Sequence, residues 1–74
     1  MSYKIKVKWD PDAAVWIATS KDVPGLVLES GSFDALVERV KNAIPELIEL
    51  NGEKQYSIKL TYVMKREDQV AVNG

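Results

Sequence analysis

The side chains best suited to chemistry in this chain are carboxylates that lie at predicted turns and on a short predicted strand. Asp10 and Asp12 flank a proline, Asp22 precedes the sequence Val-Pro-Gly, and Glu29 follows seven residues later. Two or three convergent carboxylates can bind Mg²⁺ or carry out acid–base catalysis. Aspartate is also frequent in turns, where its side chain hydrogen-bonds to nearby backbone groups. Nothing in the spacing requires Asp10 and Asp22 to converge, so the sequence favours the turn interpretation.

Nucleophilic catalysis lacks its usual partners in this sequence. The chain contains no histidine and no cysteine, which removes the commonest general base, the commonest zinc ligand and any disulfide. No Gly-x-Ser-x-Gly motif surrounds any serine, and a serine nucleophile needs an activating base. Ser32, which precedes a helical pattern, is better explained as a helix cap. We therefore expect a protein that is not an enzyme and that holds no metal and no cofactor.

Three lysines form a candidate binding surface. Lys4, Lys6 and Lys8 alternate with apolar residues, so they share one face of a predicted strand. One interpretation is a solvated sheet face whose charges discourage edge pairing. The other is an electrostatic docking surface for an acidic partner or a phosphate backbone. Lys59 would join this face if the last strand neighbours the first.

The second predicted strand is unusual because both of its faces are apolar. Val15 and Ile17 point one way and Trp16 points the other, whereas a strand covered on one side alternates with polar residues. An exposed apolar patch marks a contact surface, and tryptophan is enriched at interface hot spots. The hairpin loop decides where Trp16 lies: a four-residue loop places it beside Val7, and a five-residue loop places it on the lysine face.

The elements that position these residues follow from the hydrophobic pattern. The predicted strands are residues 3–9, 14–19, 26–30 and 56–64. A helix is expected from the Ser32 N-cap to Asn51-Gly52, because apolar residues recur there at spacings of three and four. Pro45 predicts a kink, or a break into two short helices. The order β-β-β-α-β predicts an α+β fold, a small mostly antiparallel sheet with one amphipathic helix packed on one face. The last strand can then run parallel to another strand.

Length and charge bound the class of protein. A chain of 74 residues makes one domain with a marginal core. Without disulfides, such a domain often gains stability by oligomerisation, so we expect a homodimer or a higher oligomer. Ten Lys and Arg residues against 11 Asp and Glu give a net charge of −1, which argues against nucleic acid as the primary partner. Without a signal peptide or an apolar stretch long enough for a membrane, we expect a cytoplasmic protein.

Several of these segments together resemble the HicB antitoxin family, and most closely a branch of small stand-alone bacterial proteins. The resemblance is carried by the lysine-alternating first strand, Asp10-Pro11-Asp12, Val15-Trp16-Ile17-Ala18, Asp22-Val23-Pro24-Gly25, Gly31-Ser32-Phe33 and Ile44-Pro45-Glu46-Leu47. It spans residues 3–51. The resemblance implies a degenerate ribonuclease-H-like α+β fold that lacks metal-binding carboxylates and forms dimers or higher oligomers.

The same resemblance implies a non-enzymatic antitoxin that binds and blocks a HicA-like toxin, a small protein that cleaves messenger RNA. The residues expected at the partner or oligomer interface are Trp16, Val15, Ile17, Lys4, Lys6 and Lys8. The domain is expected to span residues 1–64, followed by a polar tail over 65–74 that frays, although Val70-Ala71-Val72 is compatible with a short edge strand. Many HicB proteins bind DNA through a C-terminal module, but this tail is too short for one, so no direct DNA binding is expected.

Two other hypotheses stay open at this point. One is a stand-alone oligomeric module that binds a small molecule or an unrelated protein. The other is a residual metal-dependent nuclease that uses Asp10, Asp22 and Glu29 as metal ligands, which would require these three side chains to converge.

Overall fold

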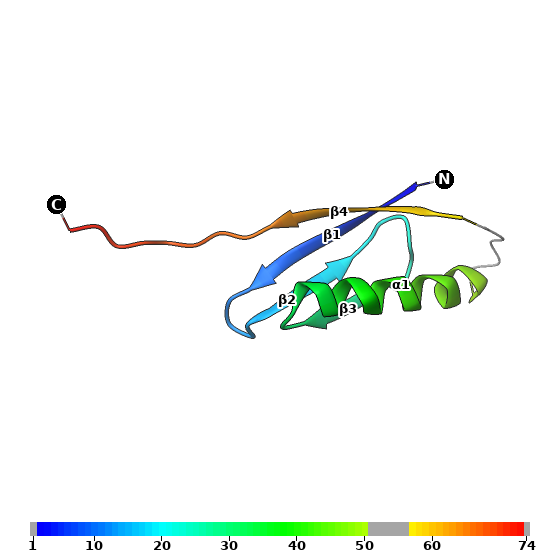
Figure 1. The fold of residues 1–74 in the computed structure, drawn as a ribbon, viewed down its shortest axis with the longest axis horizontal. Helices are drawn as coiled ribbons and strands as arrows, with labels where there is room; N and C mark the ends of the chain where they lie inside the picture. The colour runs from blue at the N-terminus through cyan, green and yellow to red at the C-terminus, as the bar shows by residue number, and fades with distance from the viewer. Residues whose placement is uncertain (1, 51–56, 74) are drawn as a thin grey trace.

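The fold is a four-stranded mixed sheet that one helix covers on one face, as the computed structural model shows for residues 2–50 and 57–73 (Figure 1). The elements in chain order are β1 (Ser2–Asp10), β2 (Val15–Thr19), β3 (Val27–Ser30), α1 (Phe33–Leu50) and β4 (Lys59–Lys65). The predicted α+β class and the order β-β-β-α-β are therefore confirmed.

The first strand holds the sheet together because it pairs on both of its sides. The strand order is β3-β2-β1-β4. β1 pairs antiparallel with β2, and β2 pairs antiparallel with β3. β4 runs parallel to β1, with Ser2 opposite Lys59 and Lys8 opposite Lys65. The sheet is thus mostly antiparallel, and the expected parallel pairing of the last strand is confirmed.

The helix begins where the sequence predicts. Ala35 N–H donates to Ser32 Oγ at 3.2 Å, and Leu36 N–H donates to the Ser32 carbonyl at 3.0 Å. Ser32 therefore satisfies donors that the first helical turn leaves open. α1 continues through Pro45 as a single helix, so the alternative of two short helices is wrong. The predicted helix end at Asn51-Gly52 lies outside the described residues.

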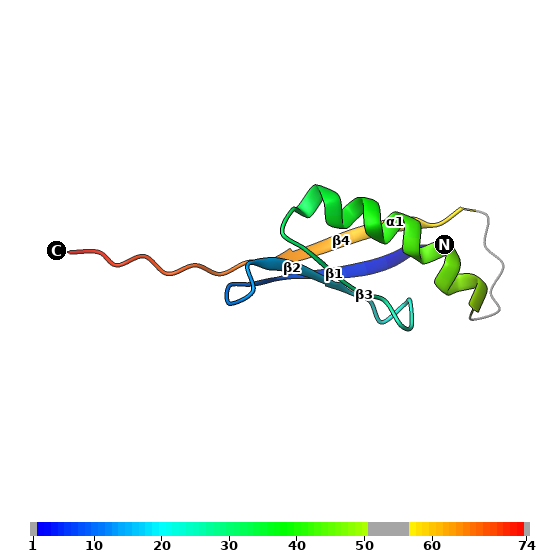
Figure 2. The same ribbon diagram turned by 90° about the horizontal axis from the view of Figure 1, so that it is seen from below.

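Apolar side chains from one face of the sheet and one stripe of the helix make the core. Ile5 and Val7 on β1 and Leu36 and Val40 on α1 have no exposed surface. Figure 2 shows α1 lying along one face of the sheet, with the opposite face uncovered. Burying an aliphatic side chain of this size contributes about 1.5–3 kcal/mol, so this single layer of contacts supplies most of the stability.

The Asp-Val-Pro-Gly segment anchors its loop in that core. Leu26 N–H donates to the Val23 carbonyl at 3.2 Å, and Gly25 has a φ of 88°. Proline followed by a residue of positive φ is typical of a type II turn, and glycine adopts this φ without strain. Val23 and Leu26 are 1% and 3% exposed. The most recognisable motif of the sequence is therefore a structural turn that buries two side chains.

Every strand differs from its predicted bounds by a few residues: β1 is one residue longer at each end, and β3 begins at Val27 instead of Leu26. β2 begins at Val15 because Ala14 has a φ of 53° and belongs to the turn. β4 extends to Lys65, and the predicted start of this strand at Tyr56 lies outside the described residues. Val70-Ala71-Val72 forms no strand, and the tail leaves the sheet as an extended chain (Figure 1).

We predict that Leu36→Ala lowers the free energy of unfolding by about 2–5 kcal/mol, because it empties a fully buried site under the sheet. A domain of this size has a total stability of about 4–11 kcal/mol. Urea denaturation followed by circular dichroism measures the loss. The control is Glu38→Ala on the exposed side of the same helix, which should change stability by less than about 0.5 kcal/mol. Equal losses in both variants would contradict the assigned helix face.

Candidate functional site

The β1–β2 hairpin decides which face carries Trp16. Asp10 lies opposite Val15, so the loop has four residues, 11–14. The Asp10 carboxylate accepts hydrogen bonds from Asp12 N–H at 3.0 Å and Ala13 N–H at 3.3 Å. Trp16 then lies opposite Trp9, on the face of Val7. The four-residue alternative is confirmed, and Trp16 lies on the side of the sheet that faces α1.

Four aromatic side chains from four elements meet there, and we call them the aromatic cluster: Trp9, Trp16, Phe33 and Tyr62. Their rings make edge-to-face contacts in sequence. The centroids are 5.1 Å apart for Trp9 and Trp16, 6.0 Å for Trp16 and Phe33, and 6.2 Å for Phe33 and Tyr62. Edge-to-face pairs at such distances each contribute about 0.5–1.5 kcal/mol beyond their burial. All four side chains are half-buried, so the cluster is both packed and accessible.

Arg66, the first residue beyond β4, extends over this cluster. Its guanidinium carbon lies 4.2 Å from the Trp9 ring centroid and 5.5 Å from that of Trp16. A guanidinium over an indole face is attracted by the ring quadrupole. The start of the tail is therefore held against the domain, and a cation is fixed at the rim of the aromatic surface.

Tyr62 places a hydroxyl where the described residues offer it no hydrogen-bond partner. Burial raises the pKa of this phenol above its ordinary value of 10.0, and the negative charge of Glu38 raises it further. A buried hydroxyl without a partner costs folding energy. A binding partner that reached this hydroxyl would supply the hydrogen bond that it lacks.

The opposite face of the sheet carries the predicted lysines. Lys4, Lys6 and Lys8 are exposed there. Lys8 lies between Ile17 and Lys65 in the register of the sheet. Val15 and Ile17 are half-buried on this same face. The structure therefore separates the predicted interface residues: Trp16 lies on the helix side, and the other five lie on the lysine face.

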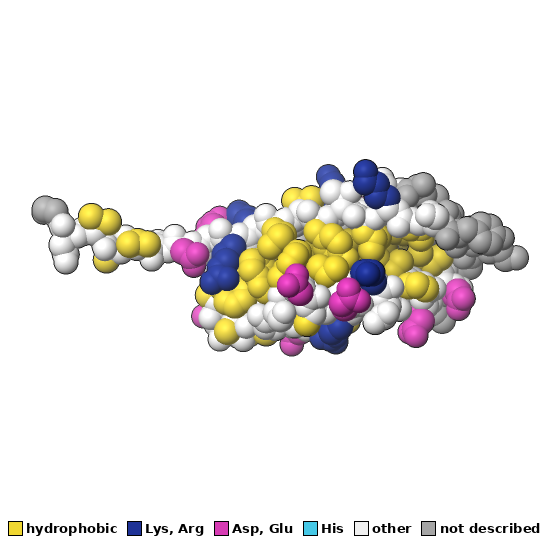
Figure 3. Space-filling model, viewed as in Figure 1, with side chains coloured by type: hydrophobic (Ala, Val, Ile, Leu, Met, Phe, Trp, Pro, Cys, Tyr) yellow, Lys and Arg dark blue, Asp and Glu magenta, His cyan; other side chains and the backbone are white. Residues whose placement is uncertain are grey.

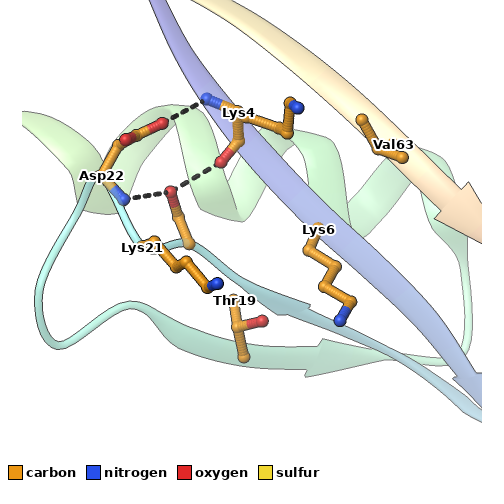
Figure 4. A pocket seen from close by; sticks show the side chains of 7 residues that line it. Lys4, Lys6, Thr19, Lys21, Asp22 and Val63 are labelled. Atoms are coloured by element: carbon orange, nitrogen blue, oxygen red, sulfur yellow. Dashed lines mark hydrogen bonds between the residues drawn. The ribbon is translucent and has the colours of Figure 1, made fainter.

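A depression of about 690 Å³ lies at one end of the lysine face (Figure 4). Its lining comprises Lys4, Lys6, Thr19, Ser20, Lys21, Asp22 and Val63. Asp22 Oδ2 accepts from Lys4 N–H at 2.8 Å, and Ser20 Oγ donates to the Lys4 carbonyl at 2.6 Å. Asp22 N–H donates to Ser20 Oγ at 3.1 Å. These bonds clamp the loop after β2 to the backbone of β1, so Asp22 has a structural task.

The three candidate metal ligands do not come together. Asp10 closes the hairpin at the end of β1, whereas Asp22 bonds to Lys4, six strand residues or about 20 Å away. Within residues 2–50 and 57–73, no group of three or more Asp or Glu side chains is placed to hold a metal ion. No helix in that part of the chain is long and apolar enough to cross a membrane.

Of Arg66 and the aromatic cluster, the sequence predicts only Trp16 as an interface residue. It misses Trp9 as well as the three residues Phe33, Tyr62 and Arg66. Phe33 was assigned to the core stripe, Tyr62 to an ordinary strand and Arg66 to the frayed tail. The alternation of side chains along β4 could have indicated Tyr62 and Arg66, because they lie four positions apart and so share one face of an extended segment. Which face that is depends on the parallel register with β1.

A family model for a domain of unknown function (DUF1902) matches residues 2–72, so the chain belongs to the DUF1902 family. The chain is also similar to a solved structure, that of the hypothetical protein TTHA1013 from the extremely thermophilic bacterium Thermus thermophilus. It is 32% identical in sequence, with a TM-score of 0.81, and the match covers 95% of this chain and all of that one. Among curated proteins, none is similar enough to count as a relative.

We expect Asp22→Ala to lower the free energy of unfolding by about 1–2 kcal/mol, because Lys4 N–H loses a charge-assisted acceptor. Thermal unfolding measures the change. Lys21→Ala, in the same loop with no such bond to β1, should be close to neutral. If Lys21→Ala costs as much as Asp22→Ala, the clamp is not what the loop contributes.

Tyr62→Phe is expected to keep or raise stability by up to about 1 kcal/mol at neutral pH, because it removes a buried hydroxyl that lacks a partner. The pKa of Tyr62 is raised in the folded state, so the unfolded chain ionises first at alkaline pH. Stability should fall as pH rises above about 10 towards the folded pKa. Denaturant midpoints measured from pH 8 to 11 should fall less for Tyr62→Phe than for the unaltered protein. Parallel pH profiles would contradict the assignment.

Proposed function

We propose that this protein is a non-enzymatic binding domain of the antitoxin type, which acts by protein–protein contact and covers the active surface of a HicA-like RNA-cleaving toxin. Two things support the proposal. One is the set of sequence motifs that resemble those of HicB antitoxins. The other, which carries most weight, is the half-buried aromatic cluster with Arg66 at its rim.

The aromatic cluster and Arg66 together have the amino-acid composition found at the centre of protein–protein interfaces. Tryptophan, tyrosine and arginine are the residue types most enriched among interface hot spots. The surface gathers both tryptophans of the chain together with Tyr62 and Arg66. Figure 3 shows hydrophobic side chains forming a band across this face of the molecule. A partner that covers it would exclude water from several aromatic rings at once.

Charge favours this face over the lysine face. A protein that cleaves RNA binds phosphates and therefore carries a basic surface, which Lys4, Lys6 and Lys8 would repel. On the helix side, Asp34 follows Phe33 in the first turn of α1, and Glu38 lies close enough to Tyr62 to act on its pKa. Alongside the positive charge of Arg66, these exposed carboxylates put negative charge on the α1 side of the aromatic cluster, which attracts a basic partner. For the lysine face, docking of an acidic partner stays a prediction.

The test uses any HicA-like protein that is encoded beside this one. We expect a stable complex in isothermal titration calorimetry and inhibition of the toxin in an RNA-cleavage assay. Glu38→Lys should raise the dissociation constant by about tenfold or more, since it places like charges together at the rim. Glu29→Lys makes the same change of charge on the opposite face of the sheet and should alter the constant by less than about threefold. Failure to form a complex, or a larger effect of Glu29→Lys, would contradict the proposal.

A further inference from the structure

The two edges of the sheet are protected unequally. β3 is a short edge strand, and the Arg39 guanidinium on α1 donates to the Glu29 carbonyl on it. β4 is the longer edge, and its outer side has no strand partner among the described residues. Its centre, Leu60 to Met64, contains no charge and no proline, the devices that usually block edge pairing. β4 is therefore open to strand addition.

The tail, residues 66–73, runs as an extended chain, and no strand among the described residues lies beside it. Residues 66–73 continue the direction of β4 past the hairpin end of the sheet (Figure 1). Lys65 and Glu67 pair at 3.0 Å, and Arg66 and Asp68 pair at 3.6 Å, which fits an extended chain whose alternate side chains share a side. The radius of gyration is 14.9 Å, against about 11 Å for a compact domain of this length.

The side chains of the tail alternate in the same phase as those of β4. Leu60 and Tyr62 lie on the helix side, and Arg66 continues that side by covering Trp9. In an extended chain, Val70 and Val72 fall on the same side as Arg66. They are 82% and 85% exposed, although isolated valines in a solvated tail contribute nothing to the domain. The tail is thus patterned as a half-buried strand that lacks its sheet.

We propose that a second copy of this chain supplies that sheet: the tails of two copies pair antiparallel with each other's β4 across a two-fold axis. A two-fold axis perpendicular to the sheet keeps both helices on the same side, because it pairs even-numbered residues with even-numbered ones. The two four-stranded sheets then become one continuous sheet. Each open edge is covered by the other copy's tail.

One register of this pairing gives Arg66 an acidic partner. The last residue of β4 and the first three residues of the tail are Lys65-Arg66-Glu67-Asp68, two cations followed by two anions. With Glu67 on the two-fold axis, Arg66 of each copy lies opposite Asp68 of the other. Glu67 then meets its own counterpart, with Lys65 of each copy on the same face to offset the like charges.

The same register gives the exposed apolar residues their partners. Val70 of the second copy lies opposite Met64, which is 47% exposed in the single chain, and Val72 lies opposite Tyr62. Both contacts extend the hydrophobic band that Figure 3 shows between α1 and β4. The occupant of this edge is therefore the tail of an identical chain, whose alternation, charge order and length all fit.

The test of this pairing needs only the purified protein and no toxin. Sedimentation equilibrium should give twice the 8.3 kDa mass of the chain. Val70→Asp combined with Val72→Asp should raise the dimer dissociation constant by about 10,000-fold, since each dimer loses four buried valines and each contributes about tenfold. Gln69→Asp combined with Asn73→Asp adds the same charge on the other side of the tail and should change it by less than about threefold. Both double variants leave the monomer core intact.

Cysteine cross-linking tests the register directly, because the chain has no cysteine of its own. Glu67→Cys should form a disulfide-linked dimer on mild oxidation, whereas Glu46→Cys, exposed on α1, should not. A monomer at all concentrations would overturn the proposal. So would a dimer that tolerates Val70→Asp with Val72→Asp, or one in which Glu67→Cys fails to cross-link. Loss of toxin binding with the dimer intact would count against the proposed function alone.

Discussion

The pairing register between β1 and β2 is the constraint on which the rest of the structure depends. Side chains alternate along a strand, so a shift of one residue would exchange the two faces of β2. The Asp10 carboxylate, by accepting two backbone donors in the hairpin loop, helps to hold the loop at four residues. As a result Ala18 enters the core and Trp16 meets Trp9 on the helix side, while Ile17 lies among the lysines.

That register also gives the two faces of the sheet different chemistry. The net charge of −1 does not show how the groups are distributed, because the exposed lysines of β1 lie on the uncovered face and the aromatic cluster lies on the helix side with Arg66 over it. A partner therefore meets either a cationic surface or an aromatic one, depending on its direction of approach. The fold is that of a DUF1902 domain. The two faces of its sheet carry the lysines and the aromatic cluster, the groups that are available for binding.

The features that sequence predicts well are those whose causes are local. The Ser32 cap and the Pro24-Gly25 turn depend on hydrogen bonds within a few residues, so their positions follow from residue type alone. Alternation in β1 and the apolar stripe of α1 are likewise readable in the sequence. The aromatic surface was only partly predictable, because Arg66 reaches Trp9 through the parallel register of β1 and β4. The clamp from Asp22 to Lys4 also joins distant segments, so spacing in the sequence could not reveal it.

The position of β1 has a consequence for how the chain is made. β1 is synthesised before the other strands and lies inside the sheet, but one of its two neighbours is β4, the last of the four strands. Pairing between such distant segments closes a long loop, which slows folding. A nascent chain on the ribosome must therefore keep one side of β1 unpaired until β4 has been synthesised. While β1 lacks this partner, the positive charges of Lys4, Lys6 and Lys8 repel the same strand of other nascent chains.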